Sequence, residues 1–333
     1  MASATLTEFL DNLYTTTWQN MKDDVKDQVF DATPFWFWLK DGGRMEEVRG
    51  GRFLTEPLQF DKTDNVQWIG RGGTVKINDF QFLTVAKFDW RYIAGTITRF
   101  GVDDQQNAGR NEIISLMNAK MENVRNVLIN EFELRLAAGA GSIVAGTTTE
   151  DALGMDGLQL AVPDDPTASA TFGGYDSSVA TWWRNKSINL TGKSFAAFGL
   201  ANMRTLFNQT GNNLRNDMPD IWVSGQTPYE LYEDQVLPIY RVSNRKLVDL
   251  GFETLNFKGR PMIWTPTIAA TRMYALNTKF FRFTYDPAYY LDMTEWKPIP
   301  NQVNDRVSHI VTACALKVSR RRCQGVIYNI DTP

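Results

Sequence analysis

Histidine is almost missing from this chain of 333 residues, which has a single one, His309. Most acid–base and nucleophilic catalytic designs use histidine, so they are excluded or must depend on that residue. His309 sits in an alternating run of valine and alanine, which favours a core or interface histidine over a catalytic one. The chain also lacks a G-x-S-x-G elbow, a P-loop and an H-E-x-x-H motif.

Cysteine is nearly as scarce. The two cysteines, Cys314 and Cys323, lie close together near the C-terminus, without a C-x-x-C spacing and without companion histidines. We therefore expect two ordinary thiols, with no disulfide and no zinc site. No metal or other cofactor is expected.

Long apolar runs and an excess of positive charge are also lacking. No apolar run approaches the roughly 20 residues that a membrane span needs, and the first residues lack the charged start and apolar core of a secretory signal. The net charge is −3, so nothing attracts the whole chain to nucleic acid or anionic lipid. We expect a chain made and kept in cytosol, whose contacts with DNA are local.

One stretch dominates what the sequence does contain. From Arg110 to Ala138, apolar side chains recur every three or four residues without an interrupting proline, and Gly139 and Gly141 follow. The spacing predicts a helix roughly 43 Å long at 1.5 Å per residue. Such a rod is more than twice the average helix of about 11 to 12 residues. An extended structure should lie along it.

The stretch before this helix alternates with the period of a β-strand. From Phe80 to Ala94 the even-numbered residues, mostly aromatic or small, share one face. An earlier extended piece, from Phe53 to Trp68, is joined to this run through the glycine-rich residues 70–73. The pattern predicts a long two-stranded ribbon, which should lie across another surface because an isolated hairpin is marginal in water.

Apolar surface is also expected near the N-terminus. The first residues predict an acidic amphipathic helix, with Leu6, Phe9 and Leu10 on one face and Glu8 and Asp11 on the other. Docking of this helix on a neighbouring subunit is favoured over docking on its own core. Four consecutive aromatic residues then follow Pro34, and such a row rarely stays in solvent. These residues are Phe35, Trp36, Phe37 and Trp38.

The adjacent tryptophans Trp182 and Trp183 are flanked by cationic residues. Such a pair could form a carbohydrate platform or a base-stacking site. Paired aromatics are more often core or interface, and we favour that interpretation.

The second half of the chain predicts a compact α/β unit followed by strands. Residues 153–160 predict a turn leading into a short strand, and 163–178 a loop. A helix from Phe195 should end at Gly211, and a second should open at Thr227 with Glu230 completing a capping box. The remaining expected strands are 221–223, two around Lys258-Gly259, 273–276, 281–285, 307–316 and 326–330.

Charged side chains offer little catalytic potential. The carboxylate pairs Asp103-Asp104 and Asp164-Asp165 could serve as general acid and base only within a pocket. The run Arg320-Arg321-Arg322, with Lys317, could touch phosphates. A solvated or intersubunit basic patch is the simpler interpretation.

The order of these parts resembles the major capsid proteins of tailed bacteriophages, the Hong Kong 97-type fold, which is an α+β fold. The resemblance covers essentially the whole chain, and its specificity lies in the order of parts more than in any motif. Short stretches similar to those of these shell proteins are Gly154–Leu158, Trp182–Asn185, Gly251–Gly259 followed by Pro261, Leu276–Phe280 and Gln324–Val326.

The resemblance implies a division of the chain and a function. The segments would be an N-terminal arm (1–45), an extended β-ribbon loop (46–104), a first peripheral part (105–191) with spine helix 110–138, an axial domain (192–268) and returning strands (269–333). The function implied is a structural, non-enzymatic one: self-assembly as pentamers and hexamers into an icosahedral head enclosing double-stranded DNA. The chain would be made in the host bacterial cytoplasm and end in the virion.

The resemblance also implies partners. They are other copies of the chain, a portal, a separate scaffolding protein and weakly held packaged DNA, with a decoration protein left open. Residues expected at intersubunit contacts are Phe35, Trp36, Phe37, Trp38, Trp68, Arg71, Phe80, Phe82, Trp90, Trp182 and Trp183. Two alternatives stay open: an encapsulin-like bacterial nanocompartment and a carbohydrate-active hydrolase that uses the tryptophans and a carboxylate pair.

Overall fold

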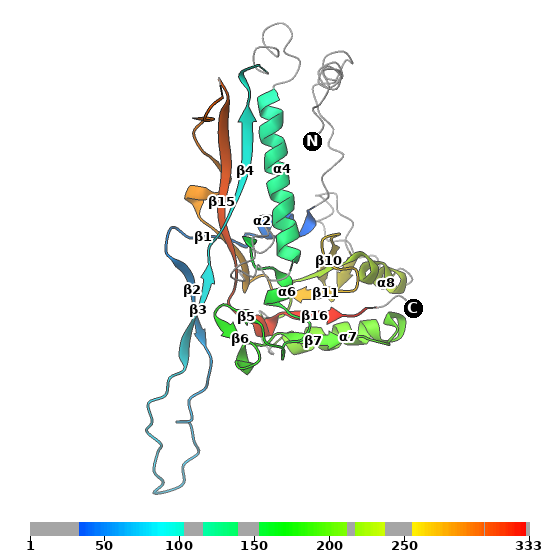
Figure 1. Ribbon diagram of the computed structural model, residues 1–333. Helices are drawn as coiled ribbons and strands as arrows, with labels where there is room; N and C mark the ends of the chain where they lie inside the picture. Colours follow the sequence, from blue (N-terminus) through cyan, green and yellow to red (C-terminus); the bar gives the residue numbers. More distant parts are fainter. Residues whose placement is uncertain are drawn as a thin grey trace. The chain divides into compact units, whose positions relative to one another are not determined.

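The structure is a computed structural model, and it describes residues 33–102, 116–138, 153–211, 217–236, 255–302 and 304–330. The predicted N-terminal helix, the first six residues of the predicted rod and Asp103-Asp104 lie outside the described residues. The chain divides into two compact units. Figure 1 labels the described helices and strands. The smaller unit takes its described residues from 93–131 and 289–312, and the larger unit contains the others.

The smaller unit is built on the predicted rod. α4 (Leu116–Ala137) begins in this unit, and its Leu128 forms a small core with Ile97 and Ile310. These two residues come from β4 (Arg91–Arg99) and β15 (Arg306–Val318). β4 and the N-terminal half of β15 pair, and β15 also pairs antiparallel with two short strands, β13 (Asp292–Met293) and β14 (Lys297–Pro298). Met121, Val124 and Leu128 of α4 pack together in this core, which confirms the predicted spacing of apolar side chains every three or four residues.

The larger unit contains a mixed sheet of six strands. The order is β7-β16-β11-β8-β10-β9, in which β7–β16 and β8–β10 are parallel pairs and the others antiparallel. The strands are β7 (Lys186–Asn189), β8 (Ile221–Ser224), β9 (Leu255–Phe257), β10 (Arg260–Trp264), β11 (Met273–Leu276) and β16 (Gly325–Tyr328). Five of these strands agree with the expected ones, whereas β7 was not expected. Lys258 and Gly259, both at positive φ, form the predicted hairpin turn.

Two helices cover this sheet, α7 (Phe195–Thr210) and α8 (Gln226–Val236). Met203, Leu206 and Phe207 of α7 and Tyr232 of α8 belong to one core cluster with sheet residues such as Trp222. The ring of Phe257 meets that of Trp222 edge to face, 5.4 Å between centroids. This core fixes the predicted α/β unit, and the helix from Phe195 ends before Gly211 as expected.

The larger unit also holds a second group of strands and the ribbon. β1 (Met45–Glu47) runs parallel to β12 (Phe281–Tyr285), which pairs antiparallel with the C-terminal half of β15. The ribbon strands are β2 (Phe53–Gln59) and β3 (Leu83–Asp89), paired antiparallel throughout. Short elements complete the description: α2 (Pro34–Asp41), α6 (Leu158–Ala161), β5 (Thr171–Phe172), β6 (Tyr175–Asp176), η2 (Thr181–Trp183), η3 (Pro287–Tyr289) and η4 (Arg321–Cys323).

The strand expected near residue 158 is wrong. Residues 158–161 form the helical turn α6, which lies against the end of α4. A Cβ at Gly157 would be 2.2 Å from the Ala138 carbonyl oxygen and 2.4 Å from that of Arg135, so only glycine permits this approach. The Gln159 N–H then donates to the Ala138 carbonyl at 3.1 Å and satisfies a group at the end of α4.

Three details of alternation and capping also differ from expectation. The face of even-numbered residues that was predicted to run to Ala94 ends at Phe88. The chain leaves the β2–β3 pair at Trp90, and Tyr92 is exposed in β4. In the first half of β15 the buried face carries Ser308 and Ile310 instead of His309. α8 begins before Thr227, and Glu230 accepts a hydrogen bond from the Gln226 side chain at 2.8 Å.

Among the described helices, none is long and apolar enough to cross a membrane.

Candidate intersubunit surface and its support

The β2–β3 ribbon has one face turned toward the body of its own unit. Leu54, Leu58, Ala86 and Phe88 are buried there. The Phe88 ring meets that of Phe172 edge to face, with centroids 5.3 Å apart. The loop expected over 163–178 therefore contains a hairpin, β5–β6, on which the ribbon rests.

The β5–β6 hairpin also binds the ribbon through polar contacts. The Lys87 N–H donates to the Gly173 carbonyl at 3.1 Å, and the Tyr175 hydroxyl hydrogen-bonds to Thr84 and to the Val85 carbonyl. Gly173 has a φ of +63° and Gly174 of +83°, the paired positive values that a two-residue hairpin turn requires.

The opposite face of the ribbon is exposed and carries several apolar side chains. Phe53, Leu83 and Val85 point away from the hairpin, and Pro57 lies opposite Val85 in the register. Polar residues of both strands share this face, and the Arg52 guanidinium lies 5.1 Å from the Phe53 ring centroid. Exposed apolar side chains that lie together, as Pro57 and Val85 do, are typical of an interaction site.

Beyond the strands, loop 60–82 keeps its two arms together without a backbone ladder. The Asn65 side chain bridges to Asn78 through two hydrogen bonds, of 2.6 and 3.3 Å, and the Gln67 amide donates to the Thr74 carbonyl at 2.6 Å. The loop turns at Gly70–Gly73, where Gly72 has a φ of +81°. The predicted ribbon and its glycine reversal are confirmed, although regular pairing ends at Gln59 and Leu83.

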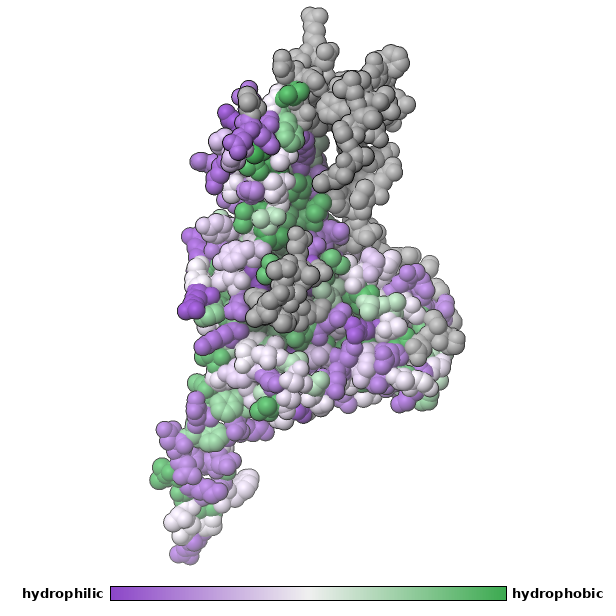
Figure 2. Space-filling view, in the orientation of Figure 1, coloured by the Kyte–Doolittle hydropathy of each residue, from purple (hydrophilic) through white to green (hydrophobic). Residues whose placement is uncertain are grey.

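The far end of this loop carries a cluster of exposed apolar side chains, which we call the loop-tip cluster. Figure 2 shows hydrophobic side chains among hydrophilic ones over this segment. Trp68 is 104% exposed and Ile77 is 91% exposed, so these side chains touch almost nothing in their own chain. The cluster consists of Val66, Trp68, Ile69, Val75 and Ile77.

A buried lysine fixes the base of the ribbon. The Lys317 ammonium lies 2.8 Å from a Glu46 carboxylate oxygen and 3.0 Å from one of Glu56. The three residues come from β15, β1 and β2, so the ion pairs join the ribbon to two strands of the body. Because Lys317 is largely buried, its charge is poorly screened by water and depends on both carboxylates.

The tryptophan pair and Arg321 support the same region. Trp183 is buried, and its indole N–H donates to the Phe172 carbonyl at 2.9 Å. The Arg321 guanidinium lies 5.3 Å from the Phe172 ring centroid and 5.8 Å from that of Trp183. It donates to the carbonyls of Ala161 and Leu160 at 2.8 and 3.1 Å. Burial lowers the pKa of Arg321 to about 10, which leaves it cationic at neutral pH.

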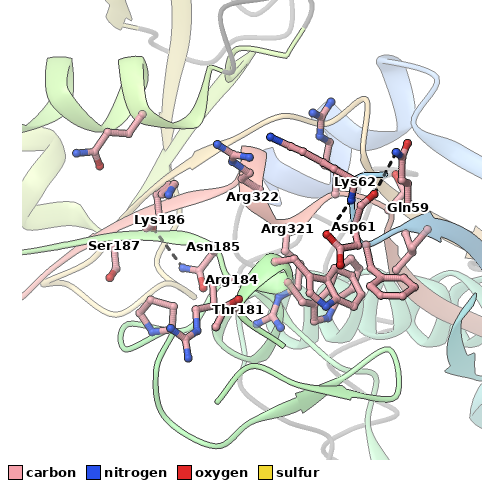
Figure 3. Close-up of a pocket in the computed structure, with 18 of the residues that line it drawn as sticks. Gln59, Asp61, Lys62, Thr181, Arg184, Asn185, Lys186, Ser187, Arg321 and Arg322 are labelled. Carbon is pink, nitrogen blue, oxygen red and sulfur yellow. Dashed lines mark hydrogen bonds between the residues drawn. The ribbon is translucent and has the colours of Figure 1, made fainter. Parts of the chain in front are cut away.

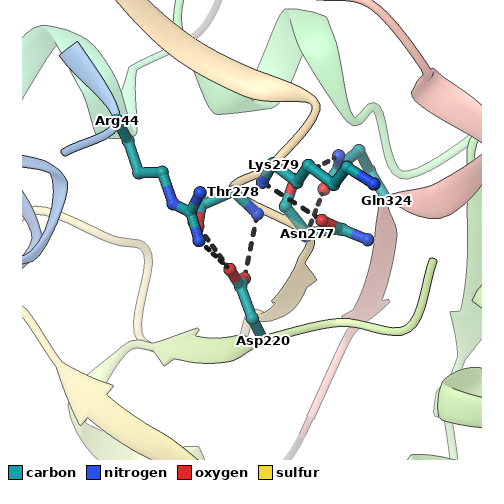
Figure 4. A network of polar contacts seen from close by, with 6 residues as sticks. All are labelled: Arg44, Asp220, Asn277, Thr278, Lys279 and Gln324. Carbon is teal, nitrogen blue, oxygen red and sulfur yellow. Dashed lines mark hydrogen bonds and ion pairs between the residues drawn. The ribbon is translucent and has the colours of Figure 1, made fainter. Parts of the chain in front are cut away.

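A polar network holds the chain before β1 against the body (Figure 4). Asp220 accepts hydrogen bonds from the Thr278 N–H, at 2.9 Å, and from its hydroxyl, and lies 3.5 Å from the Arg44 guanidinium. Beside it, the Gln324 side chain makes two hydrogen bonds with the backbone of Asn277, at 2.8 and 3.0 Å. Each of these polar groups contacts another segment of the same chain, so the network positions strands and not a substrate.

A buried acid, Glu133, anchors α2. Glu133 of α4 accepts hydrogen bonds from the Trp36 N–H at 2.7 Å and from the Thr265 hydroxyl at 2.9 Å. The Phe35 N–H makes a longer contact of 3.4 Å. The carboxyl thereby satisfies N–H groups at the start of α2. Burial raises the pKa of Glu133 to about 7, although these hydrogen bonds oppose the shift.

The structure separates the aromatic residues expected at intersubunit contacts into two groups. Phe35 is 1% exposed and Trp36 2% exposed, and Trp183 is also buried, so the expectation is corrected for these three. They fill the chain's own core, as the 4.9 Å stacking of Trp36 on Phe132 shows. Phe37, Trp68, Arg71 and Phe82 are exposed, and Trp38, Phe80, Trp90 and Trp182 are partly exposed.

The supporting residues Lys317, Glu133 and Arg321 were not expected from the sequence. The signal available for Lys317 was a lysine at the end of a strand predicted to be buried. Arg321 carried a misleading signal, because a run of three arginines indicates a solvated patch. Arg320 pairs with Asp217 at 2.7 Å, and of the three arginines only Arg322 is classed as exposed.

The potential catalytic groups have structural partners. His309 Nδ1 lies 3.1 Å from the Thr96 hydroxyl oxygen in the smaller unit. Asp164 forms an ion pair with Arg272 at 2.6 Å, and Asp165 accepts hydrogen bonds from Thr167 two residues on. Among the residues that the structure describes, no three His, Cys, Asp or Glu side chains are grouped as metal ligands.

Both cysteines are free and buried, so no disulfide joins them. Burial raises the pKa of Cys314 to about 12 and also raises that of Cys323.

We compared the chain with family models, curated proteins and solved structures. No family model matches the chain, and no curated protein is similar to it in sequence. Among solved structures, the capsid of cyanophage A-1(L) has a TM-score of 0.67 at 16% identity and covers 96% of this chain and 99% of its own. The capsid of Myoviridae phage XM1 has a TM-score of 0.55 at 12% identity, with 98% and 99% covered.

A SrpI encapsulin from Synechococcus elongatus PCC 7942 also matches, with a TM-score of 0.55 at 9% identity and 99% and 97% of the two chains covered. The chain therefore has the mixed helix and sheet fold of tailed-phage major capsid proteins, as its resemblance implied.

Proposed function

We propose that this chain is a structural shell protein that assembles into an icosahedral phage head around double-stranded DNA. The ribbon carries the proposal: ion pairs attach it at its base, its outer face exposes Phe53, Leu83 and Val85, and it ends in a loop-tip cluster that the described residues of its own unit leave exposed. If the ribbon of each copy lies on the body of the next copy, the contacts are heterologous, and such contacts form closed rings when the rotation between copies closes. The capsid fold supports the same conclusion.

Each segment of the chain would have its own structural role. Residues 1–45 would be an arm and 46–104 the extended loop reaching over a neighbour. The helix 110–138 would be the spine of a peripheral domain over 105–191, to which strands within 269–333 return. Residues 192–268 would form the axial domain at the fivefold and sixfold axes. The extended loop of this proposal contains β2, β3 and the loop-tip cluster, which agrees with the exposure of that segment.

The partners proposed are copies of the chain in pentamers and hexamers, a portal and a separate scaffolding protein, with synthesis in the host bacterial cytoplasm and a final place in the virion. A decoration protein would be an additional partner. Contact with packaged DNA would be weak, because a net charge of −3 gives no general attraction to phosphate. The chain would have no catalytic role, which the structural partners of His309 and Asp164 support.

An encapsulin-like compartment is the second candidate, because an encapsulin shares the fold. The higher TM-score of the cyanophage capsid favours the phage head. The contents of particles made in infected cells would distinguish the two, since a phage head contains DNA and a nanocompartment contains a cargo protein. The hydrolase interpretation has less support, because Trp183 is buried and Asp164 is paired with Arg272.

The experiment targets the loop-tip cluster. In Trp68→Ser/Ile77→Ser, assembly should be lost or need at least about tenfold more protein, because two exposed anchors disappear from the intersubunit contact. The melting temperature of the dispersed chain should not change. Val179→Ser is the matched control, because Val179 is equally exposed but lies outside the ribbon. Assembly of the double variant at the wild-type concentration would contradict the proposed role of the ribbon.

A further inference from the structure

A cavity of about 950 Å³ lies beside the base of the ribbon (Figure 3). Residues 57–62 form one side, 181–187 a second and 319–322 a third, and all belong to the larger unit. Its lining is strongly cationic, with Asp61 as the single carboxylate. The cationic side chains are Lys62, Arg184, Lys186, Arg320, Arg321 and Arg322.

Few of these charges are neutralised by the chain. Arg320 pairs with Asp217, and Arg184 donates to the carbonyls of Ser177 and Ser178. Among the described residues, no carboxylate forms an ion pair with Lys186, Arg321 or Arg322. Like charges gathered around one cavity repel each other and create a positive potential in it, which an anion would relieve.

Among these unpaired cations, the Arg321 guanidinium is the least favourable energetically. Its side chain is fully buried, and its Nη1 has no hydrogen-bond partner among the described residues. Its two hydrogen bonds go to carbonyls, which are neutral acceptors. A buried cation without a counter-charge is unfavourable, because two carbonyls and two aromatic rings replace only part of the solvation that water would give it. The adjoining cavity is the place where a counter-charge would act on it.

We propose that this cavity binds an oxyanion, a carboxylate or a phosphate, which Lys186 and Arg322 contact directly while Arg321 supplies charge from behind. Two sources have this chemistry: an acidic side chain from another copy of the chain, and free inorganic phosphate. The chain carries more acidic than basic residues, and six basic ones surround this cavity, so the remaining surface is rich in carboxylates. The carboxylate source rests on the proposed shell function, whereas the anion site itself does not.

Calorimetric titration of the dispersed full-length chain with inorganic phosphate at low salt tests the site. We expect saturable binding of one phosphate per chain, weakened about tenfold in Lys186→Gln/Arg322→Gln because two charge-assisted contacts are lost. Lys193→Gln/Arg204→Gln removes two exposed charges outside the cavity and should bind like the wild type. Arg321 is left intact because it holds two backbone carbonyls.

Absence of saturable binding, or equal affinity in both double variants, would overturn the proposal. Particles distinguish the two sources. If assembled particles no longer take up phosphate and Lys186→Gln/Arg322→Gln assembles poorly, a neighbour's carboxylate fills the site. If particles bind phosphate as the dispersed chain does, free phosphate is the ligand. A chain that forms no particles would contradict the shell function, while the titration of the dispersed chain would still decide on the anion site.

Discussion

The attachment of α2 to α4 makes stability depend on pH through one buried acid. Glu133→Gln replaces the carboxyl by a neutral amide of nearly the same shape. Its oxygen can still accept the Trp36 N–H. Its NH₂ group can donate to the Thr265 hydroxyl, which then turns to donate to Thr267, 2.9 Å away. The substitution therefore removes the ionisation and keeps the two shorter hydrogen bonds, while the 3.4 Å contact from the Phe35 N–H is lost at every pH.

The magnitude follows from the raised pKa. The pKa of Glu133 rises from 4.5 to about 7 on folding, so between these values the folded chain holds a proton that the unfolded chain has released. The stabilisation is complete below about pH 4.5 and is lost as the pH rises to about 7. At about 1.4 kcal/mol per pKa unit, the wild type should lose about 3 kcal/mol that Glu133→Gln does not lose.

Urea unfolding of the two proteins, followed by circular dichroism from about pH 5 to about pH 8, measures this difference. The free energy of unfolding of the wild type should fall relative to that of Glu133→Gln across the range. Glu122→Gln, which removes an exposed acid on the same helix, should follow the wild type. A constant difference between the wild type and Glu133→Gln at every pH would refute the argument.

Three further predictions concern the body of the chain. Lys317→Met leaves the Glu46 and Glu56 carboxylates without their shared cation and should lower the free energy of unfolding by about 2 kcal/mol or more, as denaturant titration would show. Lys193→Met, at an exposed position, should have little effect, and equal losses in the two variants would show that the Lys317 ion pairs do not stabilise the fold. Gly157→Ala should lower the melting temperature by several degrees, because its Cβ would overlap the Ala138 and Arg135 carbonyl oxygens. Gly70→Ala is the control, because its Cβ has open space. Equal melting temperatures of the two variants in a scanning calorimeter would show that Gly157 does not pack this closely against α4. Neither thiol should react with an aromatic disulfide reagent in the native chain at neutral pH, because both are buried and the pKa of Cys314 is raised to about 12. Both thiols should react in denaturant. Rapid labelling of the native chain would contradict this prediction by showing that the buried sites open.

The sequence predicted the parts of the fold whose signals are local. The glycines at 70–73 and Lys258-Gly259 have the conformational freedom that reversals need, and the structure turns at both places. The apolar stripe through Met121, Val124 and Leu128 matches the period of a helix, and these residues do pack against strands. Periodicity and turn residues depend on neighbours in the chain, so they can be read without knowing the fold.

Contacts between distant segments were not predictable in this way. A row of four aromatics looks like exposed apolar surface, but Phe35 and Trp36 are covered because Glu133, almost a hundred residues away, binds the start of their helix. Three consecutive arginines look solvated, but Arg321 fits between Phe172 and Trp183. Alternation likewise failed at Tyr92, because a change of partner strand at Trp90 shifts which residues face inward.

The candidate surface was predicted only in outline for the same reason. The ribbon and its apolar residues were visible in the sequence, and Trp68 is indeed fully exposed. Which face of the ribbon stays uncovered depends on the β5–β6 hairpin, and its attachment depends on Lys317 reaching two carboxylates on other strands. Neither contact leaves a local signature.

The proposed shell function is tested by imaging the purified full-length chain by negative-stain electron microscopy, with and without a coexpressed scaffolding protein. We expect closed, hollow particles of uniform diameter, in which Trp68 becomes protected from solvent relative to the dispersed chain. A chain that remains a monomer or a small oligomer under all these conditions, with Trp68 still exposed, would contradict it.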